Sequence, residues 1–285
     1  MERVGIVGLG LIGGSLALAL RRARPALRIL GIDIDPAALD QARSAGAIDD
    51  SAAPERAPYA DCDVVVLATP ARELLDALLP VARRMRPPAA LTDVCGAKEA
   101  VCARAASQRD VVFVGAHPMA GTEFRGFAAA KASLFQGATV AVCPAVGAET
   151  RRAEATAAVR DLWLAAGAGK LLDVEPRAHD HAVTYASHLP YLAAAMVVDS
   201  LGADPGAAPL ARELAAGGFR DTTRLAGDGT VGGAASLNNH VAHAARELAE
   251  RLRTLAEELE SKPDRALEWL GRLADERRRM KLPKP

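Results

Sequence analysis

The sequence has no excess of charge and no paired cysteines. Its 285 residues carry 35 Lys and Arg against 35 Asp and Glu, so the formal net charge is zero. Proteins that bind nucleic acid need a basic surface, so this balance argues against that class, although it allows a local site for a small anion. The four cysteines form no CxxC pair, and their apolar or helical surroundings predict buried, reduced thiols.

The sequence also has little that suggests export or membrane insertion. Its start, MERVGIVGLG, runs directly into a structural motif, so we expect no signal peptide. No run reaches the roughly 18 uninterrupted apolar residues that a membrane span requires. Hydrophobic residues make up 50% of the chain, which allows a sizeable core and excludes global disorder. We therefore expect a cytoplasmic protein of one large or two modest domains.

Short apolar runs alternate with helical stretches in the first half of the chain. Strands are predicted at residues 3–10, 27–35, 62–70, 90–96, 111–118 and 137–144, with a possible last strand at 170–176. Nearly continuous apolar strands separated by helices predict a parallel sheet that is covered on both faces.

Strand patterns end after this point, and helical spacing takes over. Residues 177–201 read as a helix in which Pro190 is expected to cause a kink, and two amphipathic helices are predicted at 234–261 and 263–280. The glycine-rich stretch 226–236 is the most flexible-looking part of this half. The sequence therefore predicts an α/β domain over residues 1–172 and an all-α domain over residues 173–285.

A glycine-rich loop stands between the first strand and the first helix. In VGIVGLGLIGGS, Gly8, Gly10 and Gly13 have GxGxxG spacing. Gly8 permits a tight turn, Gly10 lets the backbone approach a pyrophosphate, and Gly13 lets helix and strand pack closely. Unpaired N–H groups of the helix N-terminus then face the anion. This context predicts a Rossmann dinucleotide-binding domain; a purely structural turn, or a flavin or other adenosine ligand, are the alternatives.

An acidic residue, Asp33, follows the second strand at the position where such domains bind the adenosine ribose. Its carboxylate would accept hydrogen bonds from the ribose hydroxyls and repel a 2′-phosphate, so NAD is expected rather than NADP. The candidates for cofactor binding lie in the glycine loop or just after a strand. They are Gly8, Leu9, Gly10, Leu11, Ile12, Gly13, Asp33, Thr69 and Pro70.

One histidine, His117, stands alone in the stretch FVGAHPMAGTE. No second histidine or cysteine lies at ligand spacing, and no serine or cysteine is placed to be a nucleophile. His179 and His181, in HDH, would point to different faces of a helix. The sequence therefore predicts no metal site.

Four further stretches carry a family resemblance: TDVCGAK (92–98), GAHPMAGTEFRG (115–126), HDHAVTYASHLPY (179–191) and GGFRDTTRLA (217–226). With the glycine loop, their order and spacing resemble the prephenate and arogenate dehydrogenase family of tyrosine biosynthesis. The resemblance implies an NAD-binding domain followed by a helical domain that forms a homodimer. It also implies oxidative decarboxylation of a cyclohexadienol, giving 4-hydroxyphenylpyruvate from prephenate or tyrosine from arogenate.

The resemblance assigns roles to individual residues. His117 matches the catalytic histidine, which accepts the proton of the C4 hydroxyl; an imidazole, with a pKa near 6.5, suits this task. A histidine that caps a turn is the alternative. Arg224 matches the arginine that binds the ring carboxylate, for which a guanidinium offers a bidentate contact. Arg220 and Asp221 are weaker candidates, and Asp221 could form a gate with a residue such as Glu123.

Other matched positions lie in the substrate pocket by resemblance. They are Ser187 and His188, which belong to the first long helix of the second domain, together with Gly96 and Tyr191. The last two depart from the pattern: Gly96 stands where many relatives have a serine that hydrogen-bonds the catalytic histidine, and Tyr191 where many have a histidine. Many relatives also have a tryptophan in the region of GDGTVGGA. These departures leave open the side chain of the substrate and the group that orients His117.

Three other functions remain as alternatives. A 4-amino-4-deoxyprephenate dehydrogenase would use the same catalytic groups. A β-hydroxyacid dehydrogenase would need a catalytic lysine in the first long helix of the second domain, but there is no lysine between Lys170 and Lys262. A non-catalytic NAD-binding sensor would need neither His117 nor Arg224.

Overall fold

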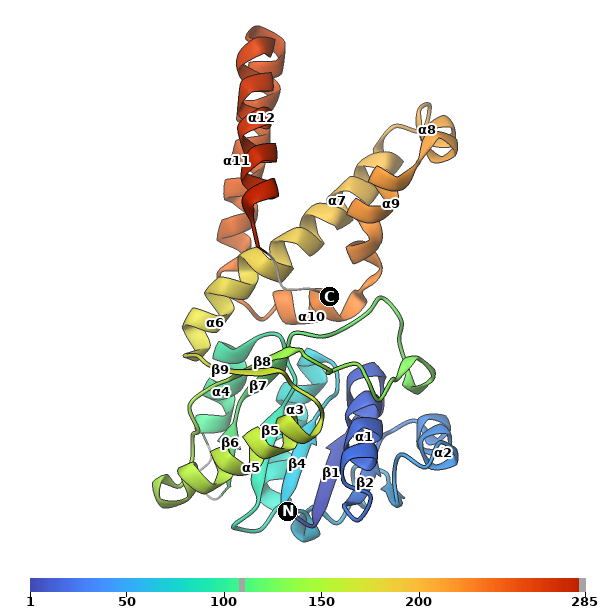
Figure 1. Cartoon of the computed structure of the whole chain (residues 1–285), viewed down its shortest axis with the longest axis vertical. Coiled ribbons are helices and arrows are strands. Elements are labelled where there is room, and N and C mark those ends of the chain that lie inside the picture. The colour runs from blue at the N-terminus through green and yellow to red at the C-terminus, as the bar shows by residue number, and fades with distance from the viewer. Residues whose placement is uncertain (108–110, 282–285) are drawn as a thin grey trace. The chain divides into compact units, whose positions relative to one another are not determined.

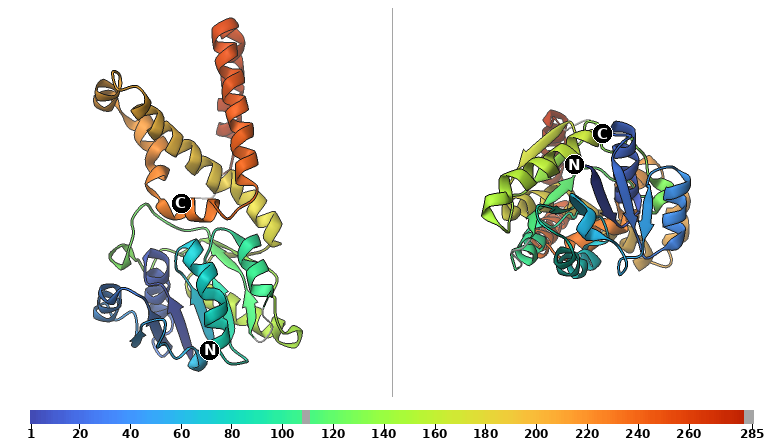
Figure 2. Two further views of the ribbon diagram at one scale, coloured as in Figure 1. Left: turned by 180° about the vertical axis from the view of Figure 1, so that it is seen from behind. Right: turned by 90° about the horizontal axis from the view of Figure 1, so that it is seen from below.

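The computed structural model describes residues 1–107 and 111–281 (Figures 1 and 2). Six of the strands that it describes form one parallel sheet in the order β3-β2-β1-β4-β5-β6. They are β1 (Arg3–Val7), β2 (Arg28–Ile32), β3 (Asp50–Ala52), β4 (Val64–Leu67), β5 (Ala90–Asp93) and β6 (Val112–Val114). Five of them match predicted strands. The exception is β3, an edge strand whose sequence, DSA, is too short and too polar to give a strand signal.

Helices cover both faces of this sheet, as the continuous apolar strands predict. They are α1 (Leu11–Ala23), α2 (Pro36–Ser44), α3 (Ala71–Arg84), α4 (Lys98–Ala106) and α5 (Arg152–Ala165). In β4, Val64 and Val66 belong to one core with α1 and α5, whereas Val65 and Leu67 belong to the other core with α3 and α4. Alternate side chains of a strand point to opposite faces, so both faces are buried. All four cysteines are buried in the second core as free thiols, as predicted.

A second, smaller sheet departs from the prediction of a single parallel sheet. It consists of β7 (Ala116–Pro118), β8 (Thr139–Val142) and β9 (Lys170–Asp173). The apolar run 111–118 is divided at Gly115: β6 pairs with β5, whereas β7 pairs antiparallel with β8. The expectation of one sheet was wrong because an apolar run predicts a strand but does not identify its partner. His117 therefore lies in the smaller sheet, opposite Ala141.

The chain after β9 is helical through His240, as predicted. It contains α6 (Pro176–Val183), α7 (Leu189–Ala203), α8 (Ala208–Leu214), α9 (Gly217–Thr223) and α10 (Gly229–Ala235). Between α6 and α7 the backbone forms a π-helical turn, Thr184–His188. Pro190, the second residue after this turn, has no N–H to donate to the turn, which explains why the irregularity occurs there. Such turns in helices are frequent at functional sites.

The stretch 226–236, predicted to be the most flexible part of this half, is largely helical. It contains the end of a 3-10 turn, Arg224–Gly227, and the whole of α10. Asp228 caps α10, because its carboxylate accepts hydrogen bonds from the Thr230 backbone N–H at 3.0 Å and from the Thr230 hydroxyl at 2.6 Å. The glycine content hid this helix, since helix propensity is only one contribution to helix formation.

The described chain forms two compact units, Met1–His240 and a second that begins at Val241. The second contains α11 (Val241–Ser261) and α12 (Pro263–Arg279), which pack against each other. Their bounds agree with the two predicted helices, although α11 begins later than predicted. The boundary predicted near residue 172 lies inside the first unit and stays a prediction. None of the described helices has the length and apolar character needed to cross a membrane.

Candidate active site

The glycine loop has the geometry that its spacing predicts. Gly8 has a φ of +91°, and a Cβ there would lie 2.7 Å from the carbonyl oxygen of Ala68. A Cβ at Gly13 would lie 1.9 Å from the carbonyl oxygen of Gly8, so α1 could not approach the loop with any other residue. In contrast, a Cβ at Gly10 would have no atom within 4 Å. Gly10 therefore borders open space at the α1 N-terminus, where N–H groups can bind an anion.

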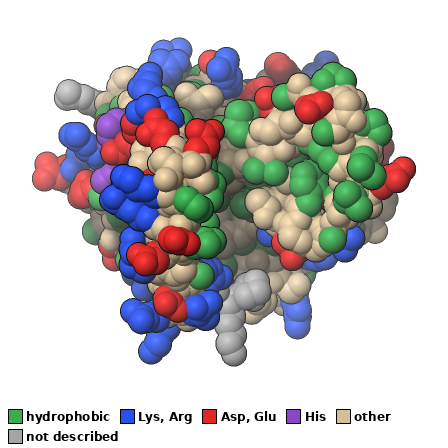
Figure 3. All heavy atoms as spheres, turned by 90° about the horizontal axis from the view of Figure 1, so that it is seen from above, with side chains coloured by type: hydrophobic (Ala, Val, Ile, Leu, Met, Phe, Trp, Pro, Cys, Tyr) green, Lys and Arg blue, Asp and Glu red, His purple; other side chains and the backbone are tan. Residues whose placement is uncertain are grey.

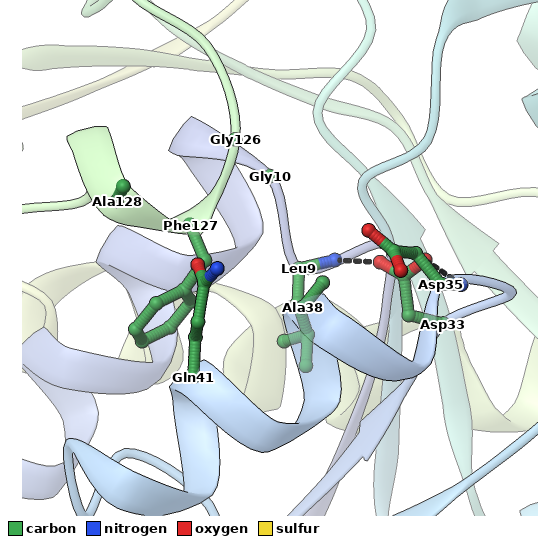
Figure 4. A pocket seen from close by; sticks show the side chains of 9 residues that line it. All are labelled: Leu9, Gly10, Asp33, Asp35, Ala38, Gln41, Gly126, Phe127 and Ala128. Carbon is green, nitrogen blue, oxygen red and sulfur yellow. Dashed lines mark hydrogen bonds between the residues drawn. The ribbon is translucent and has the colours of Figure 1, made fainter.

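A cavity of about 350 Å³ opens beside this loop (Figure 4). Its walls are Leu9, Gly10, Asp33, Asp35, Ala38, Gln41, Gly126, Phe127 and Ala128. Asp33 accepts hydrogen bonds from the backbone N–H groups of Leu9 at 2.7 Å and Asp35 at 2.9 Å, so its carboxylate is fixed at the cavity wall. None of the described residues that line this cavity is basic, so the lining offers no positive charge to the 2′-phosphate of a dinucleotide.

The remaining cofactor candidates border the same loop. Leu11 and Ile12 begin α1, and Pro70 is the residue before α3. Thr69 lies beside Gly8, because a Cβ added at Gly8 would lie 2.9 Å from the Thr69 backbone nitrogen. The Thr69 hydroxyl is buried and has no hydrogen-bond partner among the described residues. A buried hydroxyl without a partner is unusual and suits a site that a polar ligand completes.

His117 has a hydrogen-bonded partner that is distant in sequence. Its Nδ1 lies 3.0 Å from Nε2 of His179, and Nδ1 of His179 lies 2.8 Å from Oδ1 of Asp180. Asp180 in turn accepts the backbone N–H groups of Lys98 at 2.7 Å and Glu99 at 2.9 Å, at the start of α4. His179 and Asp180 are both buried. The side chain that orients His117 is therefore that of His179.

The charge states of these groups follow from their surroundings. Burial, followed by the neighbouring His179, Lys98 and His188 side chains, holds the pKa of His117 well below its usual 6.5. Burial acts to raise the pKa of Asp180, but hydrogen bonds from His179 and from the backbone of Lys98 and Glu99 outweigh it, so this pKa falls below 3.8. At neutral pH, His117 is therefore uncharged and Asp180 is ionised.

A buried ion pair holds the backbone just before His117. The ammonium of Lys98 donates to the carboxylate of Asp93 and, at 2.7 Å, to the carbonyl oxygen of Ala116. The same carboxylate accepts the Ala116 N–H at 3.1 Å. Burial disfavours the charge on Lys98, but the Asp93 carboxylate outweighs this and raises the Lys98 pKa above 10.5. Both backbone groups of Ala116 are thus fixed, and the position of His117 with them.

Gly96, one of the positions that depart from the resemblance, lies beside the ring of His117. A Cβ at Gly96 would lie 3.4 Å from both Nε2 and Cε1 of His117 and 3.1 Å from the Cβ of Ala234. The glycine therefore leaves space on the Nε2 edge of the imidazole, whereas His179 occupies the Nδ1 edge.

His188 is buried in the π turn and is held by Asn238. The Asn238 side-chain nitrogen lies 2.7 Å from the Asp180 carbonyl oxygen, 3.0 Å from the Thr184 hydroxyl and 3.1 Å from Nδ1 of His188, so these three acceptors share its two N–H groups. The Asn238 carbonyl oxygen accepts the His240 N–H at 3.0 Å, which fixes the orientation of the amide. Nδ1 of His188 is therefore an acceptor, and its proton resides on Nε2.

The other predicted pocket residues lie along α7 and the turns around it. Ser187 is half-buried in the π turn. Tyr191 packs against α10, because a Cβ at Gly232 would lie 3.0 Å from the Tyr191 hydroxyl. The two stretches that depart from the family pattern, Tyr191 and the GDGTVGGA region, are therefore in contact.

Arg224 lies close to the loop that follows His117. Its guanidinium is 3.7 Å from the carboxylate of Glu123, with 57% and 36% of the two side chains exposed. Arg220 and Asp221 are exposed on α9. His181 is exposed and contacts the rings of Tyr185 and His240, so it points away from His179, as helical spacing predicts. Among the described residues, no cluster of three or more His, Cys, Asp or Glu side chains is suited to hold a metal ion.

The sequence did not identify three of these supporting residues. Asp93 and Lys98 are the first and last residues of DVCGAK, where Asp93 ends β5 and Lys98 begins α4. This spacing was the feature of the sequence that could have identified them as an ion pair. Asn238, in LNNH, belongs to none of the motifs, and only the fold places it beside His188.

Two family models match this chain. The nucleotide-binding domain of prephenate dehydrogenase matches residues 16–171, and the dimerization domain of prephenate dehydrogenase matches residues 175–270. The prephenate dehydrogenase of Bacillus subtilis is 36% identical over 228 residues, which are 79% of this chain and 60% of the relative. The chain thus spans about 60% of the length of this curated relative.

Solved structures agree over nearly the whole chain. Prephenate dehydrogenase from Aquifex aeolicus, in complex with hydroxyphenyl propionate and NAD+, has a TM-score of 0.83 and 27% identity and covers 99% of both chains. Arogenate dehydrogenase from Synechocystis has a TM-score of 0.74 and 28% identity and covers 97% of this chain and 98% of its own.

Proposed function

The chain belongs to the prephenate dehydrogenase family, and we propose that it catalyses the NAD-dependent oxidative decarboxylation of prephenate or arogenate. The observation that carries this proposal is the environment of His117. An uncharged imidazole, supported through Nδ1 and open at Nε2 beside Gly96, is suited to accept a proton from a hydroxyl group.

We propose that NAD occupies the cavity beside the glycine loop. The α1 N-terminus at Gly10 offers N–H groups to the pyrophosphate, and Asp33 offers a carboxylate to the ribose hydroxyls. The Thr69 hydroxyl, which has no partner among the described residues, would gain one. A 2′-phosphate would meet Asp33 and Asp35 in a cavity without a basic wall, which supports NAD rather than NADP.

The residues then divide the reaction between them. His117 takes the proton of the C4 hydroxyl through Nε2, and a nicotinamide held at the glycine loop would supply the oxidant for C4. Arg224 binds the ring carboxylate, in place of its present contact with Glu123. His188, with its proton on Nε2, donates a hydrogen bond into the same pocket. Loss of the carboxylate as CO2 makes the ring aromatic.

The side chain of the substrate remains a choice between prephenate, arogenate and the 4-amino analogue of prephenate. Tyr191, packed against Gly232, offers a neutral phenol where many relatives have histidine. It can accept a hydrogen bond from an ammonium or donate one to a carboxylate. This contact makes Tyr191 the residue that we expect to discriminate between these substrates.

We propose that the protein is a homodimer through its helical segments. Figure 3 shows hydrophobic side chains gathered on the surface of the α7, α8 and α9 segment, and Met196, Val197, Val198, Leu210 and Leu214 are exposed there. On α11 and α12, Leu252, Leu259, Leu267, Leu270 and Leu273 are exposed. Apolar patches of this kind mark protein interfaces. The match to the dimerization-domain model supports the same assignment.

The test is an absorbance assay for NADH with prephenate, arogenate and the amino analogue, each with NAD and with NADP. We expect turnover of at least one substrate with NAD. His117→Asn should bind substrate but lose turnover by on the order of 10²- to 10⁴-fold, because the general base is removed. His243→Asn is a matched control, since His243 is 75% exposed on α11. If no substrate is turned over but NAD still binds, the chain is a nucleotide-binding sensor instead.

A further inference from the structure

We propose, resting on the function above, that His179 and Asp180 form a relay that sets the tautomer of His117 and holds the substrate's proton during the reaction. His179 is then a positioning residue that does not touch the substrate. It supports His117 from the Nδ1 edge of the imidazole, opposite the Nε2 edge that lies beside Gly96.

The relay begins at Asp180, whose role as an acceptor is fixed by the backbone. Oδ1 accepts the Lys98 N–H at 2.7 Å and Oδ2 accepts the Glu99 N–H at 2.9 Å. These are unpaired N–H groups at the start of α4, which stabilise an ionised carboxylate. Because an ionised carboxylate only accepts hydrogen bonds, Nδ1 of His179, at 2.8 Å, must carry a proton.

The tautomer of His117 follows from this. A neutral His179 with its proton on Nδ1 has a lone pair on Nε2, and that atom lies 3.0 Å from Nδ1 of His117. His117 must therefore donate from Nδ1, so the lone pair of its own imidazole lies on Nε2. This is the edge beside Gly96, where the glycine leaves space. The relay thus presents a base, and not a donor, to the substrate hydroxyl.

The relay can also hold the proton that leaves the substrate hydroxyl. When C4 loses hydride, the O–H bond pair becomes the second bond of the carbonyl, and the proton moves to Nε2 of His117. The Nδ1 proton of His117 can then move to Nε2 of His179, so the positive charge resides beside the Asp180 carboxylate. When the bond from C1 to the carboxylate breaks, its electron pair passes through the ring to the oxygen. The phenolate formed there takes the proton back, and no net proton is released.

In one competing arrangement, the proton of His117 lies on Nε2 instead of Nδ1. If His179 were doubly protonated, it would donate to both Asp180 and His117, and His117 would then carry its proton on Nε2. Only the first arrangement leaves a lone pair on Nε2 of His117, which the proposed function needs to accept the proton of the substrate hydroxyl. The two arrangements differ in which nitrogen of His117 is protonated.

Nitrogen NMR of the free protein, labelled with ¹⁵N at histidine, separates them without any turnover. We expect His117 and His179 each to be protonated at Nδ1 and unprotonated at Nε2 at neutral pH. His117→Asn and His179→Gln assign the signals, and His181→Gln serves as the control because His181 is exposed on the same helix. A signal from His117 with its proton on Nε2 overturns the proposal, whether or not the substrates are turned over.

Kinetics of three variants test the transfer itself. His179→Leu should lower kcat by on the order of 10²- to 10⁴-fold with little change in KM, since the base is no longer oriented. His179→Gln places a carbonyl oxygen where it can accept from Nδ1 of His117 but cannot take up a proton, so it should keep the tautomer and lose less of kcat. His181→Gln should match the wild type. A His179→Leu protein that is folded by circular dichroism and retains wild-type kcat would contradict the relay.

Discussion

The ammonium of Lys98 and the carboxylate of Asp93 form an ion pair in which neither side chain has any exposed surface. The pair does not stand alone, because the Ala116 N–H and carbonyl oxygen complete it. An ion pair without solvent is weak evidence for stability, since desolvation offsets the attraction. Its position suggests a different use: it fixes the strand residue that precedes His117.

Breaking this pair from one side should be costly. Lys98→Met leaves the Asp93 carboxylate buried without a counter-charge, and we expect the free energy of unfolding to fall by about 3–5 kcal/mol in urea titrations. The double variant Asp93→Leu with Lys98→Met should recover part of that loss, because both charges are gone, yet remain inactive since Ala116 is no longer held. A single variant as stable as the wild type would show that the pair is not buried in solution.

Stability should depend on pH through two buried histidines. Burial is the first cause that lowers the pKa of both His117 and His188 below 6.5. The unfolded chain binds protons at these imidazoles as the pH falls below 6.5, whereas the folded chain does not. Their contribution is therefore fully present above pH 6.5 and is lost progressively at lower pH. Thermal unfolding between pH 5 and 8 measures this, and His117→Asn should show a shallower dependence.

The pKa of His117 also sets the acid limb of the rate profile. Because this pKa lies well below 6.5, the base stays unprotonated in mildly acidic solution. We expect kcat/KM to stay level as the pH falls through 6.5 and to decline only at more acidic pH. A decline centred at or above 6.5 in a stably folded protein would mean that the groups around His117 do not act as described.

Arg224 should act mainly in binding the substrate. Arg224→Ala removes the guanidinium that pairs with the ring carboxylate, and we expect KM to rise by an amount equivalent to about 2–5 kcal/mol. Arg220→Ala is the matched control, because Arg220 is exposed on the preceding helix. Equal effects of the two substitutions would mean that their general positive charge, and not a specific contact, attracts the substrate.

Asp33 should decide between the two nicotinamide cofactors. Asp33→Asn removes the charge that repels a 2′-phosphate and weakens acceptance from the ribose hydroxyls, so the ratio of kcat/KM for NADP to that for NAD should rise. Asp40→Asn, an exposed change on α2, should leave the ratio unchanged. If Asp33→Asn leaves the ratio unchanged as well, the cavity beside the glycine loop does not hold the adenosine end.

Asn238 should stabilise the fold and orient His188 at the same time. Asn238→Ala leaves the Asp180 carbonyl, the Thr184 hydroxyl and Nδ1 of His188 without this donor. We expect the free energy of unfolding to fall by about 1–3 kcal/mol. The KM for substrate should rise too, since His188 could then present either tautomer. If urea titrations show an unchanged free energy of unfolding, the Asn238 amide is hydrogen-bonded to water and not to these three groups.

The parts of this site that the sequence predicted are those with local signals. Gly8, Gly10 and Gly13 occupy one loop, and Asp33 follows the next strand, so spacing alone located them. The partner of His117 could not be found in this way, because His179 is 62 residues away and reaches it only through the fold. The strand pattern likewise predicted strands at 111–118 and 137–144, but not that β7 and β8 leave the main sheet, since pairing depends on neighbours that periodicity does not identify.

The sequence did not predict helix α10, and the reason is different. Its glycines, at positions such as Gly232, are poor helix formers, so local propensity pointed to a loop. In the fold, the same absence of a side chain lets the Tyr191 hydroxyl pack against the helix. Tertiary contact therefore overrides propensity at a position beside the proposed pocket.

The hydrogen bond between His117 and His179 has a consequence for how proteins of this kind can recombine. His117 belongs to the segment before residue 171, whereas His179 and Asp180 belong to the segment after residue 175. Neither module contains a complete base with its support. A chimaera that joins this nucleotide-binding module to the helical module of a relative inherits a working histidine only if the incoming module brings its own partner for Nδ1. Exchange of modules is thus constrained by one hydrogen bond across their junction.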